Sequence, residues 1–185
     1  MEKEFAPTRL DVKALAQSGS EISGQDMLSR YERLTLDLQG SGPDLAVKWS
    51  ARGESRTSAG ANAENWLHLT LETALPLICQ RCMGPVSVPV SIQRSFRFVA
   101  SEAEALAQDE EAEEDLLVMS REFNLAELIE DELLMAVPMI PRHEVCPTPV
   151  KLAAADPGFE DSPSEKPNPF AALANLKITK PDKPG

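Results

Sequence analysis

Two runs of alternating apolar residues flank a pair of cysteines near the middle of the chain, and they constrain the fold more than any other feature. Before the pair, residues 66–72 place three leucines on one side. After it, one parity carries Val86, Val88, Val90, Ile92, Phe96 and Phe98, interrupted only at residue 94. Strict alternation is typical of half-buried antiparallel strands. Cys79 and Cys82, spaced C-x-x-C, are therefore expected at the tip of a β-hairpin, with Gly84 in a tight turn that needs positive φ.

Two further strands are predicted upstream of this hairpin. Residues 33–39 alternate leucine with polar residues, and residues 45–49 alternate again after a glycine-rich turn. Residues 50–64 are rich in Ser, Gly, Ala, Arg and Glu, which predicts a mobile loop. Pro89 lacks the N–H that a central strand needs, so its strand is expected at a sheet edge or with a bulge.

The clearest helical pattern covers residues 124–137. Asn124 fits the N-cap position, and Glu127 three residues later completes a capping-box arrangement. Apolar residues recur at i, i+3 and i+4, so one side of the helix is expected to pack on the sheet. Pro138 is expected to end the helix, because proline lacks the N–H and clashes with the preceding turn.

Together these elements predict an α+β fold. It is expected to hold an antiparallel β-sheet or partly open barrel built from hairpins, one main amphipathic helix and short terminal helices. Residues 9–16 are expected to form a strand that enters a short helix, and residues 20–29 a second short turn. The single domain is expected to cover residues 1–146, because residues 147–165 form a linker rich in proline and acidic residues.

Charge is unevenly distributed along the chain, whose formal net charge is −12. Residues 101–165 hold 18 acidic and 3 basic residues, whereas residues 166–185 hold 1 and 4. The acids at about 101–115 stand among few large apolar groups, which predicts a mobile acidic loop, and the basic end is expected to be a docking peptide. Such a chain would repel bulk RNA and attract basic proteins, unless its acids only solvate a linker and a helix face.

Several classes of protein are disfavoured by what the sequence lacks. No apolar run is long enough to span a membrane and the first residues hold no signal-peptide core, so a cytoplasmic protein is expected. Three cysteines in a cytosolic chain favour free thiols or a metal site over disulfides. Motifs of nucleotide-binding loops, zinc proteases and serine hydrolases are absent. We therefore expect no enzymatic activity, no small-molecule substrate and no membrane partner.

The cysteine pair is matched by a second pair at the same spacing. His143 and Cys146 form H-x-x-C, 61 positions after Cys82. Three thiolates and one imidazole make a reasonable ligand set for one structural zinc ion, which would staple the helix end to the hairpin. A redox pair is disfavoured, because no helix dipole lowers a thiol pKa on a hairpin. Ordinary buried cysteines beside a surface histidine are the third interpretation.

Charged side chains and the C-terminal peptide are the candidate partner-binding residues. Arg81 lies between the two cysteines, and Glu130, Asp131 and Glu132 lie on the predicted helix. The tail combines a capping residue, a proline suited to the first helical position and an apolar side. A helix this short is marginal alone, so it is expected to dock on its own domain or on a partner. The candidate residues there are Lys166, Pro167, Asn168, Pro169, Phe170 and Leu173.

Four segments together resemble the YceD family, the large ribosomal RNA subunit accumulation proteins of bacteria. They are Cys-Gln-Arg-Cys-Met at 79–83, the helix with Leu-Ile-Glu-Asp-Glu-Leu-Leu-Met-Ala-Val-Pro ending at 138, Pro-Arg-His at 141–143 and Lys-Pro-Asn-Pro-Phe-Ala-Ala-Leu at 166–173. They occur in this order, and the resemblance extends over about residues 30–177. It implies support of the synthesis, processing or accumulation of the large-subunit (23S) rRNA during ribosome assembly, with no catalytic reaction.

Three functional hypotheses follow. The first is a non-enzymatic ribosome biogenesis factor that engages large-subunit rRNA, a basic ribosomal protein or a pre-ribosomal particle. The second is a thiol or zinc protein, with redox or metal-dependent activity at Cys79 and Cys82. The third is a generic acidic adapter that binds a partner through its C-terminal peptide.

Overall fold

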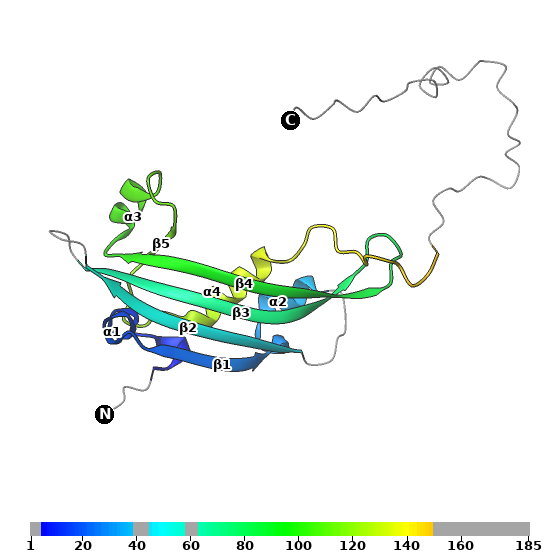
Figure 1. Cartoon of the computed structure of the whole chain (residues 1–185), viewed down its shortest axis with the longest axis horizontal. Helices are drawn as coiled ribbons and strands as arrows, with labels where there is room; N and C mark the ends of the chain where they lie inside the picture. The colour runs from blue at the N-terminus through cyan, green and yellow to red at the C-terminus, as the bar shows by residue number, and fades with distance from the viewer. Residues whose placement is uncertain (1–4, 39–44, 58–62, 150–185) are drawn as a thin grey trace, which may run out of the picture. The chain divides into compact units, whose positions relative to one another are not determined.

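A five-stranded sheet is the frame of the molecule in the computed structural model, which describes residues 5–38, 45–57 and 63–149. The strand order follows the chain, and β1 to β4 pair with antiparallel neighbours. The strands lie side by side in Figure 1. Their bounds are β1 Glu21–Met27, β2 Ala46–Arg56, β3 Glu64–Ile78, β4 Pro85–Val99 and β5 Asp115–Val118.

The predicted hairpin is the longest part of this sheet. β3 and β4 pair along almost their whole lengths, from Asn65 opposite Phe98 to Ile78 opposite Pro85. Leu67, Leu69, Leu71, Leu75 and Leu77 of β3 are all buried, whereas the polar residues between them are at least partly exposed. The alternation in the sequence is therefore confirmed as one core face and one open face.

Helices supply the other wall of the core. The described helices are η1 Pro7–Arg9, α1 Val12–Ser18, η2 Leu28–Arg30, α2 Glu32–Asp37, α3 Glu102–Gln108 and α4 Leu125–Met135. One apolar cluster joins the buried leucines of β3 to Leu15 of α1, Tyr31, and Leu125, Ile129 and Leu133 of α4. As predicted, Asn124 caps α4, accepting a hydrogen bond from the Ala126 N–H at 3.2 Å. None of the described helices has the length and apolar character that crossing a bilayer requires.

The edge of β4 shows why prolines are tolerated in this sheet. β5 pairs only with Phe96–Val99, so the rest of β4 has no neighbour on that side among the described residues. The Cys79 N–H donates to the Gly84 carbonyl. In β4, the backbone N–H and C=O groups of even-numbered residues therefore point toward β3, and those of odd-numbered residues point toward the opposite edge. Pro85 and Pro89 therefore lack an N–H only on the open edge, where prolines hinder pairing with other chains. The predicted edge position of Pro89 is confirmed.

The strand predicted at 33–39 is wrong, because Glu32–Asp37 form α2. Leu34 and Leu38 are four residues apart, so the same leucines also satisfy helical spacing. Leu34 is fully buried, whereas Leu36 is 85% exposed, as expected for a helix with one apolar side. Alternation over only three leucines could not separate the two periods.

Two predictions of irregular structure are also wrong. Residues 20–29 were expected to form a turn, but Glu21–Met27 form β1, an edge strand that pairs with β2. Residues 50–64 were expected to form a loop, but β2 continues to Arg56 and β3 begins at Glu64; residues 58–62 lie outside the described residues. These strand ends are held by backbone hydrogen bonds and carry mostly polar side chains. The sequence there therefore lacks the apolar alternation that predicts a strand.

The acidic stretch differs from the prediction as well. A loop was expected over about 101–115, but Glu102–Gln108 form α3, and the Ser101 side chain caps it by accepting from the Glu104 N–H. The chain then returns to the sheet through β5, which runs parallel to β4, whereas an antiparallel sheet was expected. The α3 crossover is what permits the parallel pairing.

Candidate metal centre

The first half of the centre is the turn between β3 and β4. The Cys79 N–H donates to the Gly84 carbonyl at 2.8 Å, and the Met83 N–H donates to the Cys79 carbonyl at 2.8 Å. The residue with positive φ is Met83, at 59°, and not Gly84 as predicted. This turn brings Cys79 and Cys82 to the hairpin tip, as expected from their spacing.

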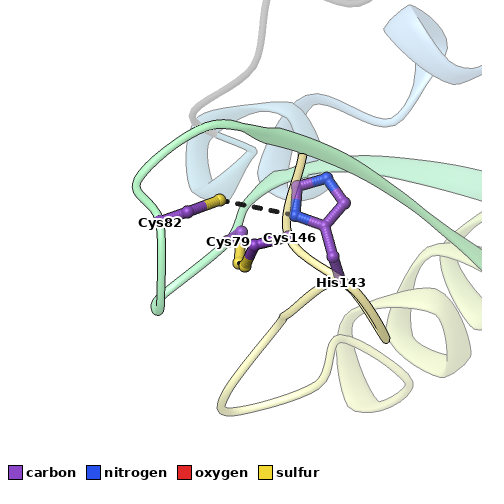
Figure 2. A group of neighbouring side chains, drawn as sticks. All are labelled: Cys79, Cys82, His143 and Cys146. Carbon is purple, nitrogen blue, oxygen red and sulfur yellow. Dashed lines mark hydrogen bonds between the residues drawn. The ribbon is translucent and has the colours of Figure 1, made fainter. Parts of the chain in front are cut away.

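The second half comes from the segment that follows α4. The Gln80 N–H donates to the Pro141 carbonyl at 2.8 Å, so this segment lies against the hairpin tip. Figure 2 shows His143 and Cys146 on the returning chain, facing Cys79 and Cys82. The structure thus brings together the four residues that the sequence singled out as metal ligands.

Four donor atoms converge in this centre. The three sulfurs and one imidazole nitrogen all lie within 4.8 Å of one another. Cys79 Sγ is 3.8 Å from Cys146 Sγ, and Cys82 Sγ is 3.5 Å from His143 Nδ1. Each of these close pairs joins the hairpin to the returning segment. The sulfurs are far beyond the roughly 2.05 Å of a disulfide, and all three cysteines are free thiols that, with the imidazole, can hold a metal ion.

Electrostatics separates the two hairpin thiols. Cys79 is fully buried, and burial by itself raises its pKa, but hydrogen bonds from the backbone N–H groups of Cys82, His143 and Arg81 bring that pKa down to about 5. The backbone at Gly84 lowers the pKa of Cys82, yet burial and the neighbouring thiols of Cys146 and Cys79 raise it overall. Gathered thiolates repel one another, so full deprotonation of the set favours a bound cation.

Arg81 belongs to this centre. Its Nε donates to Cys146 Sγ at 3.0 Å, and its Nη2 donates to the carbonyls of His143 and Glu144 at 2.9 and 3.1 Å. The bond to Cys146 raises the pKa of the guanidinium. The sequence nominated Arg81 only for partner binding and missed this role. The one signal was an arginine placed inside the C-x-x-C motif itself.

The three acidic candidates on α4 engage the protein's own arginines. Glu130 accepts from Arg33 Nε at 2.9 Å, and Asp131 accepts from Arg33 Nη1 at 2.6 Å. Glu132 is 7% exposed and lies 3.5 Å from Arg94, so it faces inward rather than toward solvent. The tail candidates at 166–173 lie outside the described residues.

Replacing Glu132 with glutamine is expected to raise the free energy of unfolding near pH 7. Burial raises the pKa of Glu132 above its usual 4.5, with Arg94 opposing, so the ionised form is disfavoured in the folded state. As pH falls through the folded-state pKa, the native carboxyl takes up a proton and the wild type recovers this loss. The advantage of the variant should therefore shrink toward pH 4.

Urea unfolding of both proteins at pH 7 and pH 4 measures this difference. Glu127→Gln is the matched control, because Glu127 is exposed on the same helix. A variant that is less stable than wild type at pH 7 would show that the ion pair with Arg94 outweighs the burial of Glu132.

Comparisons with known proteins find similar sequences. The model of a protein family described as "Large ribosomal RNA subunit accumulation protein YceD" matches residues 67–177, which include most of the β3–β4 hairpin, α4 and the four donor residues. A relative from Haemophilus influenzae, named large ribosomal RNA subunit accumulation protein YceD, is 29% identical over 182 residues, covering 96% of this chain and 99% of its own length. No solved structure matches the chain.

Proposed function

Because the chain belongs to the YceD family, we propose that it is a non-enzymatic ribosome biogenesis factor that supports accumulation of the 23S rRNA of the large subunit. The match of the family model over 67–177, extended to almost the full chain by the Haemophilus relative, is the observation that carries this proposal. We place its action in the cytoplasm, where bacterial ribosomes assemble.

The direct partner that the charges favour is a basic ribosomal protein on a pre-ribosomal particle. Between residues 102 and 115 the chain carries eight acidic residues, and all but Glu114 are exposed. Exposed acids attract Lys-rich and Arg-rich proteins at long range, whereas they oppose the phosphates of rRNA. Direct binding of rRNA is the competing outcome.

A comparison of strains tests the cellular role. Loss of the gene is expected to lower the ratio of 23S to 16S rRNA, and the wild-type chain supplied from a plasmid should restore it. An unchanged ratio in the deletion strain would refute the role in large-subunit rRNA accumulation.

Crosslinking tests the class of partner. A tagged chain is captured from growing cells after crosslinking, and bound RNA and proteins are identified. Changing Glu102, Glu110 and Glu111 to glutamine should weaken capture of a basic ribosomal protein, whereas the same change at Glu32, Glu72 and Glu127, exposed elsewhere, should not. Equal loss in both variants would indicate an effect of net charge alone, and crosslinks mainly to rRNA would refute the protein contact.

We further propose that the four donors hold one structural zinc ion. With Zn–S bonds of about 2.3 Å and a Zn–N bond of about 2.0 Å, tetrahedral angles set S···S and S···N separations of roughly 3.8 and 3.5 Å. Cys79 to Cys146 measures 3.8 Å and Cys82 to His143 measures 3.5 Å. A closed set of four protein ligands is typical of structural rather than catalytic zinc.

The geometry supports a staple more than a redox pair. Reactive cysteines usually combine a lowered pKa with partial exposure. Backbone N–H groups lower the pKa of Cys79 to about 5, but this thiol is fully buried just after the end of β3. Two of the four donors reach the site only through the segment after α4. A zinc ion would therefore tie that segment to the hairpin and hold it in place.

A further inference from the structure

Arg81 contacts the half of the centre that carries His143 and Cys146, which no helix or strand holds in place. The hairpin half is built on β3 and β4, but residues 138–146 belong to no helix or strand. The bond from Gln80 to the Pro141 carbonyl holds the start of this segment. Its far end, with Cys146, follows five residues later and needs a separate restraint.

The Arg81 side chain supplies that restraint by gripping three groups at once. Its Nη2 donates hydrogen bonds to the carbonyls of His143 and Glu144, and its Nε donates to Cys146 Sγ. A planar guanidinium with several N–H donors can span such a set, whereas an ammonium acts as a single point of charge. Both ligands of the second pair are thus oriented by one side chain from within the first pair.

The net charge of the zinc-bound centre is a second reason why a guanidinium suits position 81. Three thiolates, one neutral imidazole and a divalent cation sum to one negative charge, and the guanidinium compensates it at hydrogen-bond distance. Partners of metal ligands commonly tune affinity in this way. Arg142 offers a comparison, since it is exposed and adjoins His143 without contacting the centre among the described interactions.

We propose that Arg81 is a positioning residue of the metal centre, which pre-assembles His143 and Cys146 and sets the affinity for zinc. This inference rests on the zinc part of the proposed function. Arg81→Ala removes both the three hydrogen bonds and the charge, whereas Arg81→Lys keeps the charge but cannot span the two carbonyls and the sulfur. The two variants therefore separate orientation from charge compensation.

The test is a zinc competition titration with a chromophoric chelator on the full chain. Arg81→Ala is expected to weaken zinc binding about 10- to 100-fold, Arg81→Lys to fall between it and wild type, and Arg142→Ala to stay close to wild type. A second readout is the sulfur-to-metal charge-transfer absorption with Co²⁺ in place of zinc. Loss of the N–H donor to Cys146 should move this band to lower energy in Arg81→Ala but not in Arg142→Ala.

The outcomes distinguish failure of the zinc site from failure of the role of Arg81. A wild-type chain that binds neither Zn²⁺ nor Co²⁺ refutes the zinc site. Binding by wild type with unchanged affinity and spectrum in Arg81→Ala refutes only the role of Arg81. If Arg81→Ala does not fold, Arg81→Lys decides, because an affinity and band equal to wild type would exclude a need for the guanidinium geometry.

Discussion

Replacing Cys79 with serine is expected to abolish the proposed zinc binding and to lower thermal stability markedly. Cys79 is fully buried, and three backbone N–H groups stabilise its thiolate. A serine hydroxyl cannot replace a thiolate as a zinc ligand. Zinc at a free concentration one thousand times its Kd stabilises a folded chain by about 4 kcal/mol. A loss of this order is expected for Cys79→Ser, together with detachment of residues 138–146 from the hairpin.

Elemental analysis and thermal melts measure this effect. Wild type purified without chelator should carry about one zinc per chain, and a strong chelator should lower its melting temperature toward that of Cys79→Ser. The two histidines provide a matched pair: His143→Asn should lose the metal, whereas His68→Asn should keep it, because His68 bonds Glu54 and Ser95 on the open face of the sheet. Wild type without metal, or melts that the chelator leaves unchanged, would contradict the staple.

Replacing Gly53 with alanine is expected to destabilise the fold by about 1–3 kcal/mol or more. A Cβ atom at this position would lie 2.5 Å from the carbonyl carbon of Leu15 and 2.6 Å from the Ala16 nitrogen, both in the backbone of α1. A backbone cannot rotate away as a side chain can, so α1 would have to move off β2. The Gly53 N–H also donates to the Ser20 carbonyl at 3.0 Å, and that bond would be strained by the shift.

Urea unfolding of Gly53→Ala against Gly84→Ala tests this close approach. A Cβ at Gly84 meets only the Cys82 sulfur, at an ordinary 3.6 Å, so this control should unfold close to wild type. If Gly53→Ala unfolds at the wild-type urea concentration, the contact between α1 and β2 is looser than the structure indicates.

The long elements were predictable because each carries a strong short-range pattern. Five alternating leucines determine which face of β3 is buried, and Asn124 and Pro138 bracket α4. α2 was not predictable, because Leu34 and Leu38 fit a strand and a helix equally well. β1 was missed because an edge strand around Gly24 needs ladder hydrogen bonds but no apolar alternation.

The residue types and spacings of the metal centre are properties of the sequence by itself. Two C-x-x-C-like pairs, one on a predicted hairpin, were enough to name Cys79, Cys82, His143 and Cys146 as candidate ligands. Their convergence depends on the 60 residues between the pairs, and hence on the register of β3 with β4 and the packing of α4. Only the tertiary structure decided that Arg81 bonds Cys146 and that Glu132 faces inward. Such contacts join residues far apart in the chain, where periodicity carries no information about which side chains meet.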